Sequence, residues 1–500
     1  MQMRARIINS VLAGVLLTLV AETAPAADSL HHDAEAIRKA HEAVKREIPL
    51  AKADPTRPAY HFLPEARWMN DPNGCFFADG WYHVFYQLNP YGNEWGHMHW
   101  GHARSRDGVT WEHLPIAIWP DTEKGEHHCF SGSAVQDGEG QWQLWYTSVT
   151  GAGEDFKVPA KFNGQVMLKP LDEDFIRWGK TTDDPVKRPT LPNGIDGYAW
   201  NNYIRDPAFF KASGRTFMLL GITGSGDVGG NVAPIYEARN KRLTQWKYRG
   251  KMCDYAWDCP QMIPFGDKWM YVKTWYPPPQ YSIGTFDPKT AKFTKQHGGR
   301  LDRSKEYKTI SFLTDDRGRH IVYAWIHPTK NAKGWANCFA LPRVMSLGED
   351  GAPVQQPLPE LAKLRGEHVA FRDISSSRVL EIKGDSLEIK AVFEGVDQDA
   401  AGLRVRRSAD GSRALEIRCH RGGVNVFGTH LPAHPGGDNK ALTVHVFVDK
   451  SIIEVFVNGG QETVARVMYP PPEDQGIEVF TAGKASVDVW QMNSIWESQQ

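Results

Sequence analysis

Three short motifs, each built on an aspartate, are the parts of this chain best suited to chemistry. They are Asp71 in WMNDPNG, Asp206 in YIRDP and Asp258 in WDCP. Each aspartate lies nine or ten residues before an aromatic-rich strand that a tight turn opens, so the motifs occupy equivalent places in a repeated hairpin. If the hairpins repeat around an axis, the three carboxylates converge at one point. Converging carboxylates are the apparatus of glycoside hydrolysis.

The repeat consists of five aromatic-rich strands, each preceded by a tight turn and by another short apolar run. The strands cover residues 81–88, 141–149, 215–222, 268–275 and 319–326. Strand, turn and strand therefore recur five times, at intervals of roughly 50 to 75 residues. Radial stacking of such units hides their sheet edges, and the result is a β-propeller. The hairpins predict an all-β propeller, with a large β-sandwich of the same hairpins as the alternative.

The rest of the chain divides into segments with different residue patterns. Residues 28–56 show a short polar helical pattern and are expected to form a helical extension before the aromatic repeat at 57–345. Residues 346–367 are expected to be a linker with a short helical turn. In 368–500 apolar and polar residues alternate with period two, which indicates half-buried antiparallel strands. This last segment is predicted to be a C-terminal β-sandwich.

The N-terminus has the pattern of a signal peptide, expected at residues 1–27. Arg4 and Arg6 precede an apolar stretch at 7–20, and Ala24-Pro25-Ala26 supplies a small-residue cleavage pattern. The stretch is shorter than the ~20 residues that a membrane-spanning helix needs. We therefore expect an exported protein, secreted or periplasmic, that does not insert into a membrane.

Composition excludes several other classes of function. The chain has 500 residues, which implies more than one domain, and its formal net charge is -1, which favours neither nucleic acid nor an anionic membrane as a partner. Six cysteines are too few for a disulfide scaffold, and their pairing is left open. His97, His99 and His102 lack a carboxylate or cysteine at matching spacing, so hydrogen-bonding roles are favoured over a metal site. No metal or cofactor is expected.

The neighbours of the three aspartates favour different roles in glycosidic bond cleavage. Retaining hydrolysis needs an ionised carboxylate that attacks the anomeric carbon and a carboxyl group that protonates the leaving oxygen. Asn70, Asn73 and the Gly74 backbone are donors suited to keep Asp71 ionised, whereas Trp257, Cys259 and Pro260 form a poorly solvating wall around Asp258. Asp206 follows Arg205, a cation that would keep it ionised.

At these motifs the chain resembles glycoside hydrolase family 32, the invertase, levanase and inulinase family. WMNDPNG matches the opening motif of the family, and FYQLNP, WGHMHWGH, FSGSAV, RDP and the WDCP stretch follow in the family's order. GWANCFALPR and VDKSIIEVFVNGG resemble its later motifs, so that the similarity covers roughly residues 57–495. The resemblance implies a five-bladed propeller followed by a β-sandwich. It also implies cleavage of β-linked fructose with retention and without a cofactor.

The resemblance also assigns roles to single residues. Asp71 would be the nucleophile, Asp206 the transition-state stabiliser, and Asp258 would stand at the acid/base position. The fructose subsite would be lined by Asn70, Gln87, Trp95, Phe130, Ser131 and Arg205. Trp68 and Trp100 either frame the same funnel or pack in the core.

The chain departs from the family pattern at two positions. The family has Glu before Cys-Pro, and Asp258 withdraws the carboxyl by roughly 1 to 1.5 Å. A displacement of that size can lower a rate on the order of 100-fold. A reshaped backbone or a water can restore the reach, Asp254 or Glu306 can serve as the acid, or the protein binds sugar without cleaving it. The second departure is Lys308, which stands where the family usually has Ala after Tyr.

Three hypotheses for function follow. The first is an exported β-fructosidase that acts on sucrose or a fructan such as levan or inulin. The others are a glycosidase of this fold with a different sugar specificity and a carbohydrate-binding protein without activity. The sandwich is predicted to be structural or accessory, and its Asp449 and Glu454 are expected to face solvent or the interdomain seam. Endo or exo action and oligomeric state stay open.

Overall fold

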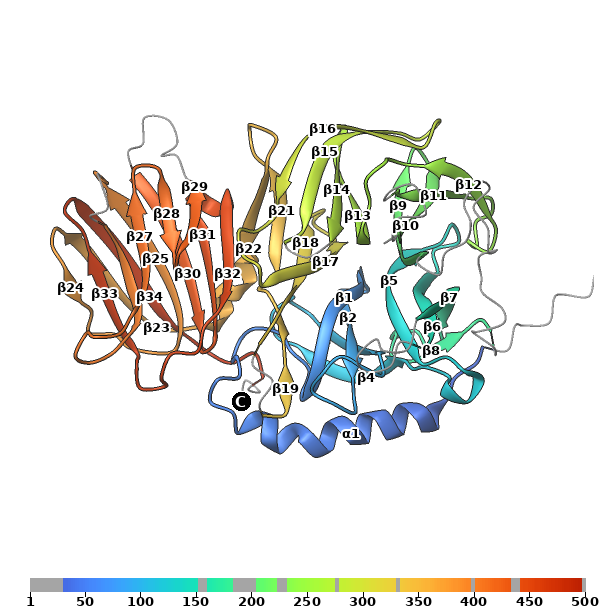
Figure 1. The fold of residues 1–500 in the computed structure, drawn as a ribbon, viewed down its shortest axis with the longest axis horizontal. Coiled ribbons are helices and arrows are strands. Elements are labelled where there is room, and N and C mark those ends of the chain that lie inside the picture. The colour runs from blue at the N-terminus through green and yellow to red at the C-terminus, as the bar shows by residue number, and fades with distance from the viewer. Residues whose placement is uncertain are drawn as a thin grey trace, which may run out of the picture.

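The computed structural model describes residues 30–151, 160–182, 204–222, 232–274, 278–329, 333–396, 401–432 and 441–496. In these ranges the chain is almost entirely β-structure, arranged as two units side by side (Figure 1). The expected signal peptide, 1–27, lies outside the described residues. No helix in the described part of the chain is long and apolar enough to cross a membrane.

The larger unit contains five antiparallel sheets, one for each predicted hairpin. The first has β1 (Arg67–Ala78), β2 (Trp81–Asn89), β3 (His99–Ser105) and β4 (Glu112–Ile118). The second has β5 (His128–Gln136), β6 (Trp142–Thr150), β7 (Lys161–Pro170) and β8 (Trp178–Lys180). The third has β9 (Ile204–Ala212), β10 (Arg215–Ile222), β11 (Pro234–Ala238) and β12 (Trp246–Lys251).

The remaining two sheets follow the same plan. The fourth has β13 (Asp258–Phe265), β14 (Lys268–Thr274), β15 (Gln280–Asp287) and β16 (Lys292–Arg300). The fifth has β17 (Tyr307–Thr314), β18 (His320–Ile326), β21 (Arg343–Leu347) and β22 (Pro353–Pro357), with β20 (Cys338–Phe339) paired to β18. The five predicted aromatic strands correspond to β2, β6, β10, β14 and β18, the second strand of each sheet.

The first strands of the five sheets form a closed ring. Along the ring β1 contacts β5, β5 contacts β9, β9 contacts β13, β13 contacts β17, and β17 contacts β1 (Figure 1). The short β19 (Trp335–Ala336), which follows the fifth sheet, pairs in parallel with β1 through Arg67 and Trp335, and this pairing fastens the end of the ring to its beginning. The unit is a five-bladed propeller, as predicted.

Within the described residues, one helix precedes the propeller. Helix α1 (Ala34–Lys52) begins at Asp33, whose carboxylate accepts a hydrogen bond from the Ala36 N–H at 2.9 Å. Its buried side, which includes Ile37, Ala40 and Val44, packs against the first blade at β4 and β1 (Figure 1). The helix lies within the range 28–56 expected to be a helical extension.

The C-terminal unit is a sandwich of two six-stranded antiparallel sheets. One sheet, in spatial order, has β23 (Arg365–Ile374), β34 (Lys484–Met492), β25 (Ser386–Glu394), β30 (Ala441–Asp449), β31 (Ile452–Val457) and β32 (Glu462–Val467). The other has β24 (Arg378–Val379), β33 (Gly476–Phe480), β26 (Ala401–Arg407), β27 (Leu415–His420), β28 (Gly423–Val426) and β29 (Thr429–Pro432). Alternate residues such as Leu387 and Ile389 fill the core between the sheets, which confirms the sandwich.

The segment 346–367, expected to be a linker, is mostly regular structure. It contains the end of β21, all of β22, the 3₁₀ helix η3 (Pro359–Leu364) and the start of β23. The sequence suggested a linker because Pro353 and Pro357 stand at the ends of β22. Proline is tolerated there because β22 is an edge strand. The described residues also include the 3₁₀ helices η1 (Thr122–Lys124) and η4 (Asn458–Gly460).

The two acidic residues singled out in the sandwich face the interdomain seam and not solvent. Asp449 is fully buried and accepts hydrogen bonds from the backbone N–H groups of Ala59, Tyr60 and His61 at 2.7 to 2.9 Å. Glu454, also fully buried, accepts from Arg343 Nη2 at 2.6 Å. Both carboxylates therefore bind propeller-side segments to the sandwich.

Candidate active site

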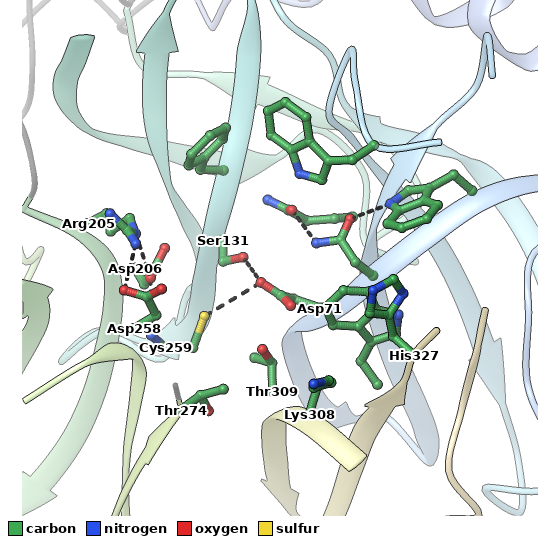
Figure 2. A pocket seen from close by; sticks show the side chains of 16 residues that line it. Asp71, Ser131, Arg205, Asp206, Asp258, Cys259, Thr274, Lys308, Thr309 and His327 are labelled. Atoms are coloured by element: carbon green, nitrogen blue, oxygen red, sulfur yellow. Dashed lines mark hydrogen bonds and ion pairs between the residues drawn. The ribbon is translucent and has the colours of Figure 1, made fainter. Parts of the chain in front are cut away.

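A single open pocket brings together every residue that the sequence assigned to the site. It has a volume of about 380 Å³ and is lined by side chains from several blades (Figure 2). The predicted residues that line it are Asp71, Asp206, Asp258, Asn70, Gln87, Trp95, Phe130, Ser131 and Arg205. The lining also includes Trp68, Cys259, Thr274, Lys308, Thr309, Trp325 and His327.

Each blade reaches the pocket through an irregularity at the same point of its inner strand. Two residues of the inner strand face one residue of the next strand in four blades, and these unpaired residues are 70–71, 206–207, 259–260 and 308–309. In the second blade the unpaired residue is Ser131. Such β-bulges bend a strand and redirect its side chains. The five bulges, four of two residues and one of a single residue, thus turn side chains from five strands toward one pocket.

The three aspartates do not occupy the same position in these bulges. Asp258 is the last paired residue before its bulge, Asp206 is the first unpaired residue of its own, and Asp71 is the second. The prediction that the three aspartates occupy equivalent places is therefore correct in that each lies at the bulge of its inner strand. It is wrong in that each holds a different position relative to the bulge. All three carboxylates nevertheless line the same pocket.

Asp71 is held by a small set of neutral donors. Ser131 Oγ donates to Asp71 Oδ2 at 2.6 Å, and Cys259 Sγ lies 3.6 Å from the same oxygen (Figure 2). Burial raises the pKa of Asp71 above its ordinary value of 3.8, and hydrogen bonds from Ser131 and Thr309 oppose the rise. The carboxylate is thereby oriented while one side of it still faces the pocket.

Asp206 is the most enclosed of the three carboxylates. Its backbone adopts a left-handed conformation with φ 59°, and its Oδ2 accepts from the Cys259 N–H at 3.0 Å. Burial raises the pKa of Asp206 well above its ordinary 3.8, and the Arg205 guanidinium works against this. Cys259 is left-handed as well, with φ 44°. Strained non-glycine residues of this kind gather at functional sites.

Asp258 is bound to the cation next to Asp206. Arg205 Nη2 contacts Asp258 Oδ1 at 2.6 Å, and Arg205 Nε lies 3.5 Å from Asp206 Oδ2. Figure 2 shows Asp258 turned toward Arg205 at one side of the pocket, whereas Asp71 faces Ser131 and Cys259. One guanidinium therefore joins the carboxylates of the third and fourth blades.

A chain of hydrogen bonds through two side-chain amides orients the pocket residues of the first blade. Trp68 Nε1 donates to Asn70 Oδ1 at 2.9 Å, and Asn70 Nδ2 donates to Gln87 Oε1 at 2.6 Å. Gln87 Nε2 in turn donates to the Cys129 carbonyl at 3.3 Å. These contacts determine which atoms of both amides remain available to sugar hydroxyls.

Aromatic rings form the walls between the polar groups. Trp95 stacks on His128 with ring centroids 5.0 Å apart and meets the edge of Phe130 at 5.8 Å. Trp325 stacks on His327 with ring centroids 4.4 Å apart and belongs to the cluster against which Trp95 packs. Flat apolar faces beside convergent hydrogen-bonding groups suit a sugar ring, which has an apolar C–H face and a rim of hydroxyls.

Some residues considered from the sequence lie away from the pocket. Trp100 is fully buried in the core between the first two blades. The carboxylate of Asp254 is 87% exposed and pairs with Lys251 at 3.8 Å, and Glu306 pairs with Arg466 of the sandwich at 3.3 Å. Neither alternative acid lines the pocket. Asp258 is therefore the acid candidate that the geometry leaves.

The sequence did not single out Thr274, Thr309, Trp325 and His327. Thr274, Trp325 and His327 lie at or just beyond the far ends of β14 and β18, where no local motif marks them. The one available signal is the pairing of the hairpin strands, which sets these ends beside the bulges of β13 and β17. Thr309 occupies the same bulge as Lys308.

The structure also locates the residues considered for metal binding and disulfides. All six cysteines lie in the described residues, and all are buried free thiols. In the described part of the chain no three His, Cys, Asp or Glu side chains group as a metal site. His102 forms a hydrogen bond with His83 at 3.0 Å, deep in the first blade.

Comparison with known proteins identifies relatives over almost the whole chain. The model of the glycosyl hydrolases family 32 N-terminal domain matches residues 61–357, and that of the family's C-terminal domain matches 360–497. Sucrose-6-phosphate hydrolase of Escherichia coli is 30% identical, over 94% of this chain and 98% of its own. Levanase of Bacillus subtilis is 29% identical, over 99% of this chain and 76% of its own.

Solved structures show the same fold. Sucrose-6-phosphate hydrolase from Lactobacillus gasseri superposes with a TM-score of 0.77 at 24% identity, over 91% of this chain and 97% of that one. Fructan 1-exohydrolase IIa from Cichorium intybus superposes with a TM-score of 0.74 at 24% identity, over 88% and 98%.

Proposed function

We propose the following function for this chain, which is a glycoside hydrolase and belongs to glycosyl hydrolase family 32, the β-fructofuranosidase family. It cleaves β-fructofuranosidic bonds with retention at the anomeric carbon. The observation that carries the proposal is the continuous set of contacts that joins three carboxylates in one pocket. Asp71 contacts Cys259, Cys259 donates to Asp206, and Arg205 joins Asp206 to Asp258.

In the proposed mechanism Asp71 is the nucleophile. Its carboxylate attacks the anomeric carbon and forms a covalent fructosyl-enzyme, which water then hydrolyses. Ser131 and Cys259 fix one oxygen and leave the other for attack. Asp206, deeply buried, accepts hydrogen bonds from sugar hydroxyls and stabilises positive charge as the bond breaks.

Asp258 is the proposed acid and base. It gives a proton to the leaving oxygen in the first step and takes one from water in the second. To do so it has to part from Arg205, since the carboxylate oxygen nearest the cation is 2.6 Å from it. Substrate that binds between the two residues can separate them.

The proposed substrates are sucrose and fructans of the levan or inulin type. Support comes from the amide chain of Asn70 and Gln87 and from the aromatic walls, which suit one fructosyl unit. The relatives named for sucrose-6-phosphate and for levan point to the same class of bond. Residues 1–27 support export, so we place the reaction outside the cytoplasm.

A second candidate is a carbohydrate-binding protein without activity. The observation that favours it is the Arg205–Asp258 ion pair, because Oδ1 of the proposed acid is engaged by Arg205. The two candidates differ only in whether bound sugar releases Asp258. Both predict binding of fructosides in the same pocket.

The test is a panel of sucrose, levan, inulin and aryl fructofuranosides, followed by NMR of the first product. Release of fructose whose first-formed anomer is β supports retention. Release of the α anomer contradicts the Asp71 nucleophile. Binding of the panel without any release supports the second candidate.

A further inference from the structure

A buried hydroxyl lies in the pocket wall beside the proposed acid. Thr274 is the last residue of β14, lines the pocket and is 7% exposed. Its Oγ1 is shielded from solvent and has no hydrogen-bond partner among the described residues. Buried hydroxyls are nearly always hydrogen-bonded, because an unsatisfied one costs free energy. The Thr274 hydroxyl is therefore a donor that another group of the pocket can use.

The register of the fourth blade places this hydroxyl next to Asp258. Thr274 lies directly opposite Asp258 in the antiparallel ladder of β13 and β14. Side chains of such a pair project from the same face of the sheet, with Cβ atoms about 4.5 to 5.5 Å apart. Figure 2 shows Asp258, Cys259 and Thr274 along the same side of the pocket. At that separation a hydroxyl on one residue can reach a carboxyl on the other.

The backbone of Asp258 is packed from two sides. On one side it pairs with Thr274 in its own sheet. On the other side Gly221 of β10 is so close that a Cβ on Gly221 would lie 3.3 Å from the Asp258 Cα and 2.7 Å from the Trp257 carbonyl oxygen. The carboxyl therefore leaves Arg205 by rotation of the Asp258 side chain between staggered positions, and not by movement of the strand.

We propose that Thr274 is a positioning residue, whose hydroxyl donates a hydrogen bond to the Asp258 carboxyl once substrate has separated Asp258 from Arg205. The inference rests on the proposed function, because it concerns how the acid of that reaction is held. The new bond replaces the contact with Arg205 and fixes the carboxyl in the position from which it protonates the leaving oxygen. Thr274 keeps its own proton throughout.

Kinetics of two variants at this position test the proposal. Thr274→Val keeps the shape of the side chain and removes the hydroxyl. Its kcat for sucrose is expected to fall roughly tenfold, with KM within about twofold, because one hydrogen bond that acts after substrate binds is lost. Its kcat/KM for a nitrophenyl fructofuranoside, whose leaving group needs no proton, is expected to stay within about twofold of wild type. Thr274→Ser restores the hydroxyl and is expected to recover most of the rate.

The matched control is Thr285→Val, which makes the same change in the same sheet. Thr285 lies in β15 and outside the pocket lining, so its loss is expected to leave all kinetic constants unchanged. Thermal melting verifies that each variant folds. Thr274→Val is expected to keep or raise the melting temperature, because a methyl group replaces a buried hydroxyl without a partner.

A double variant separates action through Asp258 from direct contact with the sugar. Asp258→Ala removes the carboxyl that the Thr274 hydroxyl is proposed to hold. In this background Thr274→Val is expected to lower sucrose hydrolysis by less than about twofold further, since two residues that act as a unit are not additive.

The outcomes distinguish this inference from the proposed function. Full activity of Thr274→Val overturns the role of Thr274 and leaves the β-fructosidase intact. A rise in KM alone, or a tenfold loss that persists in Asp258→Ala, overturns it as well, because the hydroxyl then contacts the sugar. A lower melting temperature with equal losses on both substrates shows a structural role instead. Absence of any hydrolysis of the panel by the wild-type protein contradicts the proposed function itself.

Discussion

Arg205 of the third blade forms an ion pair with Asp258 of the fourth, with 2.6 Å between Nη2 of the arginine and Oδ1 of the aspartate. The two residues are structural equivalents, since each is the last paired residue before the bulge of its inner strand. Neighbouring blades thus set an arginine beside the carboxylate proposed to be the acid. Under the proposed mechanism, activity requires that substrate separates this pair.

Asp258→Ala is expected to slow substrates with poor leaving groups far more than aryl fructosides with activated leaving groups. Activated groups depart without a proton, so they bypass the acid, whereas natural sugars lose roughly 100-fold or more. The measurement is kcat/KM for sucrose and for a nitrophenyl fructofuranoside. Asp254→Ala, which removes an exposed carboxylate outside the pocket, is the control and is expected to leave both values unchanged. Equal rates of wild type and Asp258→Ala on every substrate would exclude Asp258 as the acid.

Asp258→Glu tests the reach of the acid separately. If the pocket has kept the space of the longer side chain, the added methylene is expected to raise activity on sucrose, because the carboxyl then reaches past Arg205. Steady-state kinetics of this variant beside wild type gives the answer. A fall in activity on sucrose and on the aryl fructoside alike shows instead that the backbone has closed around aspartate.

Asp71→Asn is expected to abolish hydrolysis while the fold remains. The amide keeps the shape of the carboxylate and can still bond to Ser131, but it cannot attack the anomeric carbon. Loss of a covalent route costs several kcal/mol in the barrier, so less than about a tenth of the rate remains. Kinetics on the best substrate of the panel, with melting as the fold control, measures this. A variant that keeps more of the rate speaks against the nucleophile.

Asp449→Ala is expected to destabilise the protein without changing kcat. Asp449 accepts three backbone N–H groups and His61 Nδ1 at 2.8 Å in a fully buried seam, so its removal leaves buried donors unpaired. Breaking such a buried group costs about 3 to 5 kcal/mol. Chemical denaturation gives the loss, and kinetics at a temperature where the variant is folded gives kcat. A selective fall in kcat at unchanged stability is the contrary result.

The same seam predicts a stability loss in alkaline solution. Burial lowers the pKa of His61, but its bonds to Asp449 and Glu454 outweigh burial and raise the pKa from 6.5 to about 9. The folded state therefore binds the proton more tightly, and this stabilisation is complete below pH 6.5 and is lost as pH rises through about 9. Its size is on the order of 3 kcal/mol. Denaturation of wild type and His61→Gln at pH 6 and 9.5 is the test, and an equal pH dependence of the two would refute it.

The sequence by itself determined the repeat and the chemistry that the repeat carries. Five hairpins with aromatic second strands, Asp-Pro motifs before their turns, and period-two strands after them follow from local residue patterns, and the propeller and sandwich contain all of these. The motifs were sufficient to identify nine pocket residues, of which seven lie on the inner strands β1, β5, β9 and β13, while Gln87 lies on β2 and Trp95 in the loop after it.

Only the tertiary structure decided where each side chain points. Positions in the five bulges depend on which residues pair across a hairpin, so Asp71, Asp206 and Asp258 differ in position although their spacing to the turns is alike. No local pattern distinguishes Trp100 from Trp325, yet Trp100 packs in the core between blades, whereas Trp325 lines the pocket. Asp449 is buried because residues 59–61, almost 400 positions earlier, supply its hydrogen bonds. Contacts across such distances depend on how separately formed blades pack, and no local pattern encodes them.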